Sequence, residues 1–316
     1  MRALGRRLLY LIPVLFVVSA LSFGLLKLLP GDPAVNILGP SATPAAVAQL
    51  HHTLGLDKPV VSQYVHFVNR ALHGDLGRSY QNGQPTTQAL RQRLPVTLEL
   101  MLLSQIIALA VAIPVAILSA MRPDSLFDRI STSISFGFLA LPNFIVGVVL
   151  VLMFAVTFHL FPATGYTPLT QNPVENLKSL LLPSVTLALS GIATYLRLLR
   201  ADLITTLQED FITNARAKGM SSRRILLAHA LRPSSFSLMT VIGLTLASLI
   251  GGTFVVEIIF ALPGIGELTV QSIYSRDYIV VQGTVLLITV GYVVFNVAVD
   301  LLYSVLDPRI RAGAAA

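Results

Sequence analysis

The sequence lacks cysteine altogether and is poor in charged residues. Charged side chains make up 12% of its 316 residues, whereas soluble domains carry roughly 25%. Hydrophobic residues make up 54%, and the mean hydropathy is +0.76. So few charges cannot cover a soluble globule, and the same numbers exclude a disordered chain. The absence of cysteine excludes disulfide frameworks, thiolate nucleophiles, iron–sulfur clusters and cysteine zinc sites.

Several catalytic motifs are absent as well. No glycine is followed by lysine, so the chain has no Walker A phosphate loop, and neither H-E-x-x-H nor G-x-S-x-G occurs. No catalytic triad or carboxylate pair stands out, which disfavours a membrane enzyme. Four of the six histidines fall in one segment, at His51, His52, His66 and His73. We interpret them as surface histidines, because His51 and His52 point to different faces of a helix and His66 and His73 have no carboxylate at ligand spacing. No metal site is predicted.

Six apolar runs reach the length that a membrane-crossing helix needs, about 20 residues. They cover residues 8–29, 96–118, 130–158, 180–199, 236–259 and 279–305, and the third and sixth are long enough to tilt. The first run follows Arg2, Arg6 and Arg7, a pattern shared with signal peptides and twin-arginine signals. Its length of about 22 residues, against 7–15 in a signal peptide, predicts an uncleaved anchor instead.

The basic residues predict the orientation of the chain in the membrane. With the N-terminus inside, eight of the 22 basic residues fall outside, and five of those eight lie in one long loop, where the positive-inside rule weakens. The other fourteen fall inside. This distribution predicts that both termini are cytoplasmic. It also explains the net charge of +7 without a nucleic-acid partner.

Two connections are too long to be simple turns. Residues 30–95 form an outer segment with its own predicted fold, including short helices at 45–54 and 63–72. Asp57-Lys58-Pro59 and Asn82-Gly83-Gln84-Pro85 are typical of turns. Residues 200–232 form a basic cytoplasmic loop. The predicted parts are therefore residues 1–29, 30–95, a helical core at 96–305 that includes this loop, and a tail at 306–316.

Ionisable residues within the predicted spans are few. A charged group costs about 2.5–3.5 kcal/mol at the centre of a span, so such groups often mark function. Asp300 lies in the last run, about two turns from its cytoplasmic end. We interpret it as pairing with Arg197, at the inner end of the fourth run. A secondary carrier would show several charges at mid-depth and broken helices in two halves, so this class is disfavoured.

The cytoplasmic loop carries a distinctive pattern. Ala215-Arg216-Ala217-Lys218-Gly219 is followed by Arg223-Arg224-Ile225 and His229-Ala230-Leu231-Arg232. This pattern resembles the coupling loop of binding-protein-dependent ABC importer permeases, above all the dipeptide, oligopeptide and nickel branch. It departs from the wider superfamily in two places. Thr213-Asn214-Ala215 stands where that superfamily has Glu-Ala-Ala. Pro233 stands one residue after the position at which that superfamily has proline at the end of the loop.

Further segments resemble the first permease subunit of peptide importers, in the same order over about residues 1–311. Each is weak alone, but their order and spacing together are specific. They are Leu29-Pro30-Gly31-Asp32-Pro33, Leu54-Gly55-Leu56-Asp57, Gly74-Asp75-Leu76-Gly77, Arg93-Leu94-Pro95, Thr97-Leu98-Glu99-Leu100, Ala140-Leu141-Pro142, Pro263-Gly264-Ile265-Gly266, Arg276-Asp277-Tyr278 and Asp307-Pro308-Arg309-Ile310.

The resemblance implies an all-α membrane protein with six transmembrane helices, the type I ABC importer permease fold, and a small extracytoplasmic domain between helices 1 and 2. It implies a non-enzymatic, multi-pass subunit of the cytoplasmic (inner) membrane that forms, with a second homologous permease, a pathway for di- or oligopeptides. The other implied partners are two ATPase subunits or domains, which bind the ATP and Mg, an extracytoplasmic substrate-binding protein and membrane lipid. No cofactor is expected in this chain. Nickel or another metal complex, glutathione and haem stay open as cargos.

Two sets of residues follow from the resemblance. The first is the ATPase-coupling loop, in which small alanines admit a partner surface and basic residues face it. A two-turn helix is predicted at residues 211–218, and Gly219 ends it in left-handed geometry. The second is an outer gate or binding-protein contact, where Pro263 and the glycines after it end the fifth helix before a short helix at 267–274. The coupling set is Phe211, Ala215, Arg216, Ala217, Lys218, Gly219, Arg223 and Arg224, and the outer set is Glu257, Pro263, Gly264, Gly266, Arg276 and Asp277.

Overall fold

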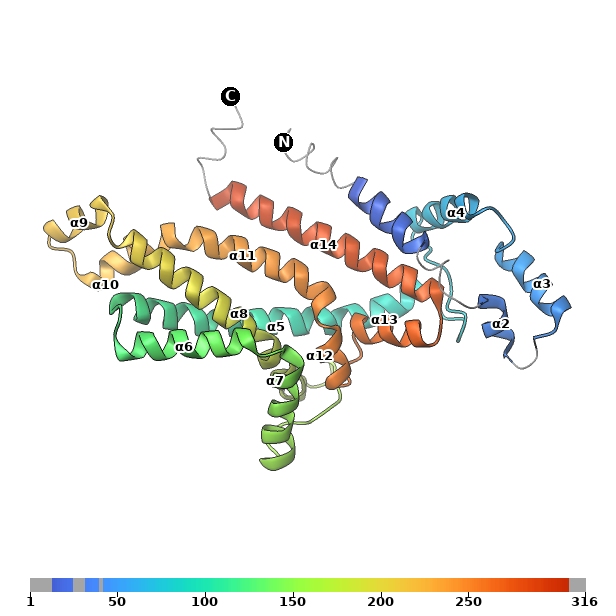
Figure 1. Cartoon of the computed structure of the whole chain (residues 1–316), viewed down its shortest axis with the longest axis horizontal. Coiled ribbons are helices and arrows are strands. Elements are labelled where there is room, and N and C mark those ends of the chain that lie inside the picture. The colour runs from blue at the N-terminus through green and yellow to red at the C-terminus, as the bar shows by residue number, and fades with distance from the viewer. Residues whose placement is uncertain (1–12, 25–31, 40–41, 307–316) are drawn as a thin grey trace, which may run out of the picture. The chain divides into compact units, whose positions relative to one another are not determined.

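The computed structural model describes residues 13–24, 32–39 and 42–306, with only the backbone of Pro33, Asn36, Leu54 and 300–306. The N-terminal tip, both ends of the first predicted run and the tail beyond residue 306 lie outside these ranges. The described residues contain helices and no strand, which confirms the all-α prediction (Figure 1).

The helices carry the labels of Figure 1, and an unlabelled apolar helix at Pro13–Gly24 precedes them. They are α2 (Pro33–Leu38), α3 (Pro44–Leu54), α4 (Val60–Leu72), α5 (Thr86–Met121), α6 (Leu126–Ala140), α7 (Asn143–Leu150), η2 (Val151–Thr157), α8 (Pro173–Thr206), α9 (Asp210–Ala217), α10 (Ser222–Arg224), η3 (Ile225–Ala230), α11 (Leu231–Gly252), α12 (Phe254–Ile259), α13 (Ile265–Tyr274) and α14 (Tyr278–Leu306).

Four described helices are long and apolar enough to cross a membrane. These are α5, α8, the continuous stretch Ser222–Gly252 and Tyr278–Val299 of α14. A bent pair of helices adds a fifth candidate. The first predicted run is described only at Pro13–Gly24, so the count of six spans stays a prediction.

The chain divides into two units, Leu98–Leu262 and a second that combines Met1–Thr97 with Pro263–Ala316. The outer segment 30–95, predicted as a domain of its own, thus shares a unit with the C-terminal helices. The helix α5 contributes residues to both units, because its first turns precede residue 98.

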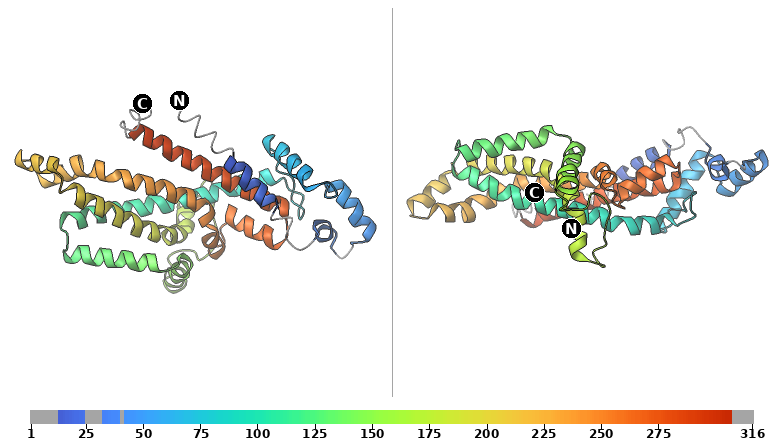
Figure 2. Two further views of the ribbon diagram at one scale, coloured as in Figure 1. Left: turned by 45° about the horizontal axis from the view of Figure 1, so that its top comes forward. Right: turned by 90° about the horizontal axis from the view of Figure 1, so that it is seen from below.

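Small residues hold the first of these units together. Ala108, Ala112, Ala116 and Ala120 recur every fourth position on α5 and are almost fully buried, in one core with Tyr195 and Leu199 of α8. A Cβ built on Gly191 would lie 3.2 Å from the Ala108 Cβ, so these two helices approach closely. Such small-residue contacts are how membrane helices gain packing, since lipid tails compete for large apolar side chains. Figure 2 shows α6 and α11 beside α8 from two further sides.

The third predicted span, 130–158, is wrong as a single helix. It consists of Leu126–Ala140 and Asn143–Thr157, which meet at an angle of 104°. Pro142 stands at the break, where it caps α7. A proline cannot donate the backbone hydrogen bond that would continue a helix, and it disfavours helical geometry in the residue before it.

Other helix boundaries also differ from their predicted positions. The helix α5 begins at Thr86, ten residues before the predicted start at 96, and α8 extends well beyond 180–199 at both ends. The fifth helix ends at Gly252, and the short α12 follows after Thr253. Pro183 sits inside α8, as membrane helices tolerate when neighbouring helices cover the affected backbone.

The outer segment matches its prediction more closely. The helices expected at 45–54 and 63–72 are α3 and α4, and both predicted turns follow them in the chain. In the same unit, a Cβ built on Gly77 would lie 2.8 Å from the Ile279 side chain, and one on Gly283 would lie 2.5 Å from that of Thr86. Glycine at both positions lets the outer segment approach the start of α14 closely.

Candidate functional site

The predicted coupling loop contains a short helix, α9, between α8 and α10. Asp210 lies in its first turn and Arg216 in its last. This order is favourable because the helix dipole is positive at the N-terminus and negative at the C-terminus. The predicted two-turn helix at residues 211–218 therefore differs from α9 by one residue at each end.

Gly219 ends α9 in left-handed geometry, with φ at +77°, as predicted. The Gly219 N–H donates to the Arg216 carbonyl at 2.9 Å, and the Met220 N–H donates to the Ala215 carbonyl at 3.3 Å. These two bonds form a Schellman motif, which commonly places glycine at this position. No other atom lies within 4 Å of a Cβ built on Gly219, so the backbone conformation alone selects for glycine.

One face of α9 packs inside the chain. Ile212 and Ala215, three residues apart, are 0% and 5% exposed and share a core with Leu203 of α8 and Ile225 of η3. The prediction that Ala215 offers a small surface to the ATPase is therefore wrong for its side chain. The helical period places Ala215 on the same side as Ile212, and that side is buried.

The opposite face of α9 and the segment after it remain exposed. The exposed side chains include two apolar ones, Phe211 at 47% and Leu227 at 53%. Among the described residues, none of the basic side chains here forms an ion pair with a carboxylate. This coupling surface consists of Phe211, Arg216, Ala217, Lys218, Arg223, Arg224 and Leu227.

A π-helical stretch, η3, joins the coupling surface to α11. Pro233 follows it and has no N–H to donate to the His229 carbonyl, and its ring would clash with that carbonyl in a regular α-helix. The wider π-helical winding accommodates this proline. Such windings are rare and frequently occur at functional sites.

An ion pair at the start of α6 anchors α8, the helix that shares a core with α9. The Arg200 guanidinium donates to both Asp128 carboxylate oxygens, at 2.5 and 2.6 Å. The Asp124 N–H donates to the same carboxylate at 2.9 Å, and the Asp128 side chain is 3% exposed. Sequence reasoning missed this pair. The available signal was Ser125, which caps α6 three residues before Asp128.

The residues predicted for an outer gate are mostly buried. Glu257 is 0% exposed, and the Thr253 hydroxyl donates to its carboxylate at 2.9 Å. Gly264 and Gly266 are buried, and the short helix predicted at 267–274 is α13. The Ile265 N–H at its start donates to the Thr97 hydroxyl at 2.9 Å.

Asp277 holds the predicted turn at 82–85 through its neighbour Ser79. The Ser79 hydroxyl donates to one oxygen of this 3% exposed carboxylate, and the Gln81 amide donates to the Ser275 carbonyl at 2.8 Å. Burial and the nearby Asp277 carboxylate raise the pKa of Tyr80 to about 12. Arg276 is exposed, at a φ of +57°. Of the outer set, Arg276 is thus the side chain most open to a partner.

The remaining predicted sites have mixed outcomes. The Arg197 guanidinium lies 4.7 Å from the centroid of the Phe136 ring. The Asp300 side chain lies outside the described part, so its pairing with Arg197 stays a prediction. The described residues hold no group of three or more histidines and carboxylates able to bind a metal. His51 instead pairs with Asp32, with Nε2 at 2.7 Å from Oδ1.

Comparison with known proteins identifies the family. Residues 112–312 match the model described as "Binding-protein-dependent transport system inner membrane component", and residues 1–101 match its N-terminal counterpart. A putative peptide transport system permease protein of Brucella abortus is 42% identical over 306 residues, covering 97% of this chain and 98% of the relative.

Two further relatives and one solved structure also match this chain. The oligopeptide permease AppB of Bacillus subtilis is 39% identical, with 97% of this chain and 98% of AppB covered. The dipeptide permease DppB of Escherichia coli is 35% identical, with 97% of each chain covered. A chain of the inward-facing MetNI methionine ABC transporter matches with a TM-score of 0.56 at 19% identity, covering 70% of this chain and 97% of that one. This chain therefore belongs to the inner membrane components of binding-protein-dependent transport systems and has the fold of an ABC importer permease.

Proposed function

We propose that this chain is a permease subunit of an ATP-driven importer for di- or oligopeptides. The observation that carries the cargo class is the 35–42% identity, over 97% of the chain, to relatives named as peptide, oligopeptide and dipeptide permeases. Membership of the family makes it a multi-pass protein of the inner membrane. With a second homologous permease it lines the transport pathway.

The energy for transport comes from partner subunits. The sequence has no Walker A motif, so we assign ATP and Mg to two ATPase subunits or domains, and no cofactor to this chain. The coupling surface supports this assignment, because it exposes Phe211 and four basic side chains on and just after α9 and at the start of the stretch Ser222–Gly252. We place this surface, and both termini, in the cytoplasm.

Closure of the ATPase dimer would move α9 and switch the pathway between inward and outward access by rigid-body motion. Because Ile212 and Ala215 of α9 share a core with Ile225 of η3 and Leu203 of α8, a push on α9 would be transmitted through this core to α8. The Arg200–Asp128 ion pair then carries the displacement from α8 to α6.

Uptake tests the cargo. A strain that lacks this gene is compared with the same strain carrying it on a plasmid, using radiolabelled dipeptide, radiolabelled pentapeptide and nickel. Restoration of peptide uptake alone is expected. Restoration of nickel uptake without peptide uptake would replace the proposed cargo and leave the ABC permease assignment intact.

The outer segment is the part that we assign to receiving an extracytoplasmic binding protein. Its turns are ordered by the Ser79–Asp277 and Asp32–His51 hydrogen bonds. Replacing residues 44–54 with a Gly-Ser linker of equal length should lower the affinity for the binding protein and leave the ATPase subunits bound. Unchanged docking affinity and unchanged uptake would exclude α3 from this role.

A further inference from the structure

The outer helix α4 exposes an apolar stripe that the transport assignment does not explain. Val61, Val65 and Leu72 are 74%, 60% and 80% exposed. Their spacing of four and seven residues places them on one side of the helix. Ser62, His66 and Asn69 are exposed beside them, at positions that form a separate polar stripe.

The third side of α4 packs on the helix Pro13–Gly24. The Tyr64 hydroxyl lies 2.8 Å from the Ser19 hydroxyl, and its ring centroid lies 5.9 Å from that of Phe16 and 5.5 Å from that of Phe23. The Phe67 ring lies 6.1 Å from that of Phe23. Around the helix, the packed side, the exposed apolar stripe and the polar stripe follow one another in that order.

These contacts lie within the first predicted span. The first apolar run continues to Leu29. Phe23 stands six residues and Phe16 thirteen residues before its end. The run covers residues 8–29, so Ser19 and Phe23 lie in the half that leads into the outer segment, and Phe16 lies just before the midpoint. Chain order alone fixes this side, because α4 follows the first run.

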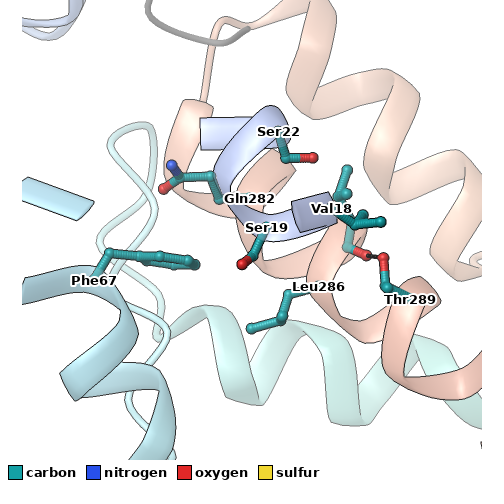
Figure 3. A pocket seen from close by; sticks show the side chains of 8 residues that line it. Val18, Ser19, Ser22, Phe67, Gln282, Leu286 and Thr289 are labelled. Atoms are coloured by element: carbon teal, nitrogen blue, oxygen red, sulfur yellow. Dashed lines mark hydrogen bonds between the residues drawn. The ribbon is translucent and has the colours of Figure 1, made fainter. Parts of the chain in front are cut away.

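Contacts with α14 give a similar depth. Phe67 lines a small cavity together with residues of the first helix and of α14 (Figure 3). Leu286, in the wall of this cavity, lies about 12 Å along the helix from its first residue, Tyr278. The cavity of about 10 Å³ has room for no more than one water molecule, so it is no ligand site. Its lining residues are Val18, Ser19, Ser22, Phe67, Gln282, Val285, Leu286 and Thr289.

We propose that α4 is an interfacial helix that lies in the outer leaflet of the bilayer against the first span. In this arrangement Val61, Val65 and Leu72 contact acyl chains, and Ser62, His66 and Asn69 face the headgroups and water. Interfacial helices bury their apolar side roughly 5–10 Å into this boundary. The exposed stripe continues a lipid-facing surface of the neighbouring span, where Phe16, Val17 and Leu21 are 60%, 50% and 60% exposed.

Spin labels test the position of α4. The native sequence has no cysteine, so single cysteines can be placed at 61, 62, 65, 66, 69 and 72 without further changes. The labelled permease complex is reconstituted in nanodiscs of phosphatidylethanolamine and phosphatidylglycerol. Collision of each label with oxygen, which partitions into lipid, and with a water-soluble nickel chelate is then measured. Labels at 61, 65 and 72 should collide mainly with oxygen, and labels at 62, 66 and 69 mainly with the chelate.

Two results would overturn the proposal. Equal collision of all six labels with the chelate would place α4 in water, as a surface for a soluble partner. Loss of both kinds of collision at 61, 65 and 72 would show that a protein subunit covers the stripe.

A matched pair of variants links lipid contact to the apolar stripe itself. Val65→Asp and Asn69→Asp add the same charge one turn apart on α4. With the label at position 72, Val65→Asp should lower oxygen collision and raise chelate collision, because it draws the stripe out of the acyl chains. Asn69→Asp should change neither. Equal effects of the two variants, or no effect of Val65→Asp, would refute contact between this stripe and lipid.

Discussion

The helices α9 and α4 are both short and amphipathic, yet they expose opposite kinds of side chain. The exposed side of α9 is polar and basic apart from Phe211 and Ala217, whereas α4 exposes Val61, Val65 and Leu72. Their packed sides differ too, because Ile212 and Ala215 of α9 are fully buried and α4 has no fully buried residue. A helix that meets a soluble partner must be held firmly by its own chain. A helix at a membrane surface can take part of its support from lipid.

The largest expected effect concerns the Arg200–Asp128 ion pair. Arg200→Ala would leave the 3% exposed Asp128 carboxylate without its cation, and breaking a buried pair costs roughly 3–5 kcal/mol. We expect a clear fall in the thermal stability of the permease complex and loss of uptake. The double variant Arg200→Ala with Asp128→Ala should recover part of the stability. No recovery would show that the pair does not act as a unit.

A second prediction uses the two sides of α9. Ala215→Trp overfills the core around Ile212 and Leu203, and overpacking costs about 1–3 kcal/mol, so it should lower thermal stability. Ala217→Trp, on the exposed side, should leave stability unchanged and reduce ATPase association. Thermal denaturation and co-purification measure the two effects. Equal loss of stability in both variants would contradict the assignment of the two sides.

A third prediction concerns the end of α9. At Gly219, with φ at +77°, a side chain costs about 1–2 kcal/mol in left-handed geometry. Gly219→Val should therefore weaken ATPase association by roughly 10-fold, since 1.4 kcal/mol corresponds to a factor of ten. Gly219→Asn should be close to wild type, because asparagine tolerates this geometry.

Lys218→Ala is a further control for the end of α9, because it removes one exposed charge worth about 0–1 kcal/mol. Wild-type ATPase association and wild-type uptake in Gly219→Val would refute the assignment of this loop to ATPase coupling.

The smallest expected effect is on the end of α4. The Gly77 N–H and the Arg70 guanidinium hold the pKa of Asp75 below its ordinary value of 3.8. This contribution to the fold is therefore present above that value and is lost as the pH falls through the lower pKa of the folded state. Hydrogen exchange at residues 73–77 should accelerate in that range. Asp75→Asn should show the faster exchange at every pH, and a wild-type profile in this variant would refute the role of Asp75.

The sequence predicted local features well. It located α3 and α4 within three residues and α9 within one, because turns, apolar periodicity and a terminal glycine are local signals. It missed the 104° bend at Pro142, since the apolar run continues unbroken through it and hydropathy does not register direction. It also missed the Arg200–Asp128 pair, because 72 residues separate the two partners.

The predicted orientation of the Ala215 side chain was wrong for a different reason. Alanine is compatible with a core and with a contact surface, so composition alone cannot assign its side. Only the burial of Ile212, three residues earlier, decides it. The hydrogen bonds of Glu99 were likewise unpredictable. Glu99 accepts from Tyr166 and Asn176, and both donors come from a segment far away in the sequence.

The chain passes between its two units at residues 97–98 and 262–263, and each crossing lies beside a proline. Pro95 stands inside α5 two residues before the first crossing, and Pro263 stands at the second. Neither residue can donate a backbone hydrogen bond, so α5 lacks the bond from residue 95 to the Arg91 carbonyl, and no helix can continue through Pro263 with a full set of backbone bonds. Proline therefore interrupts the backbone hydrogen bonding of the chain close to both points at which the chain changes unit.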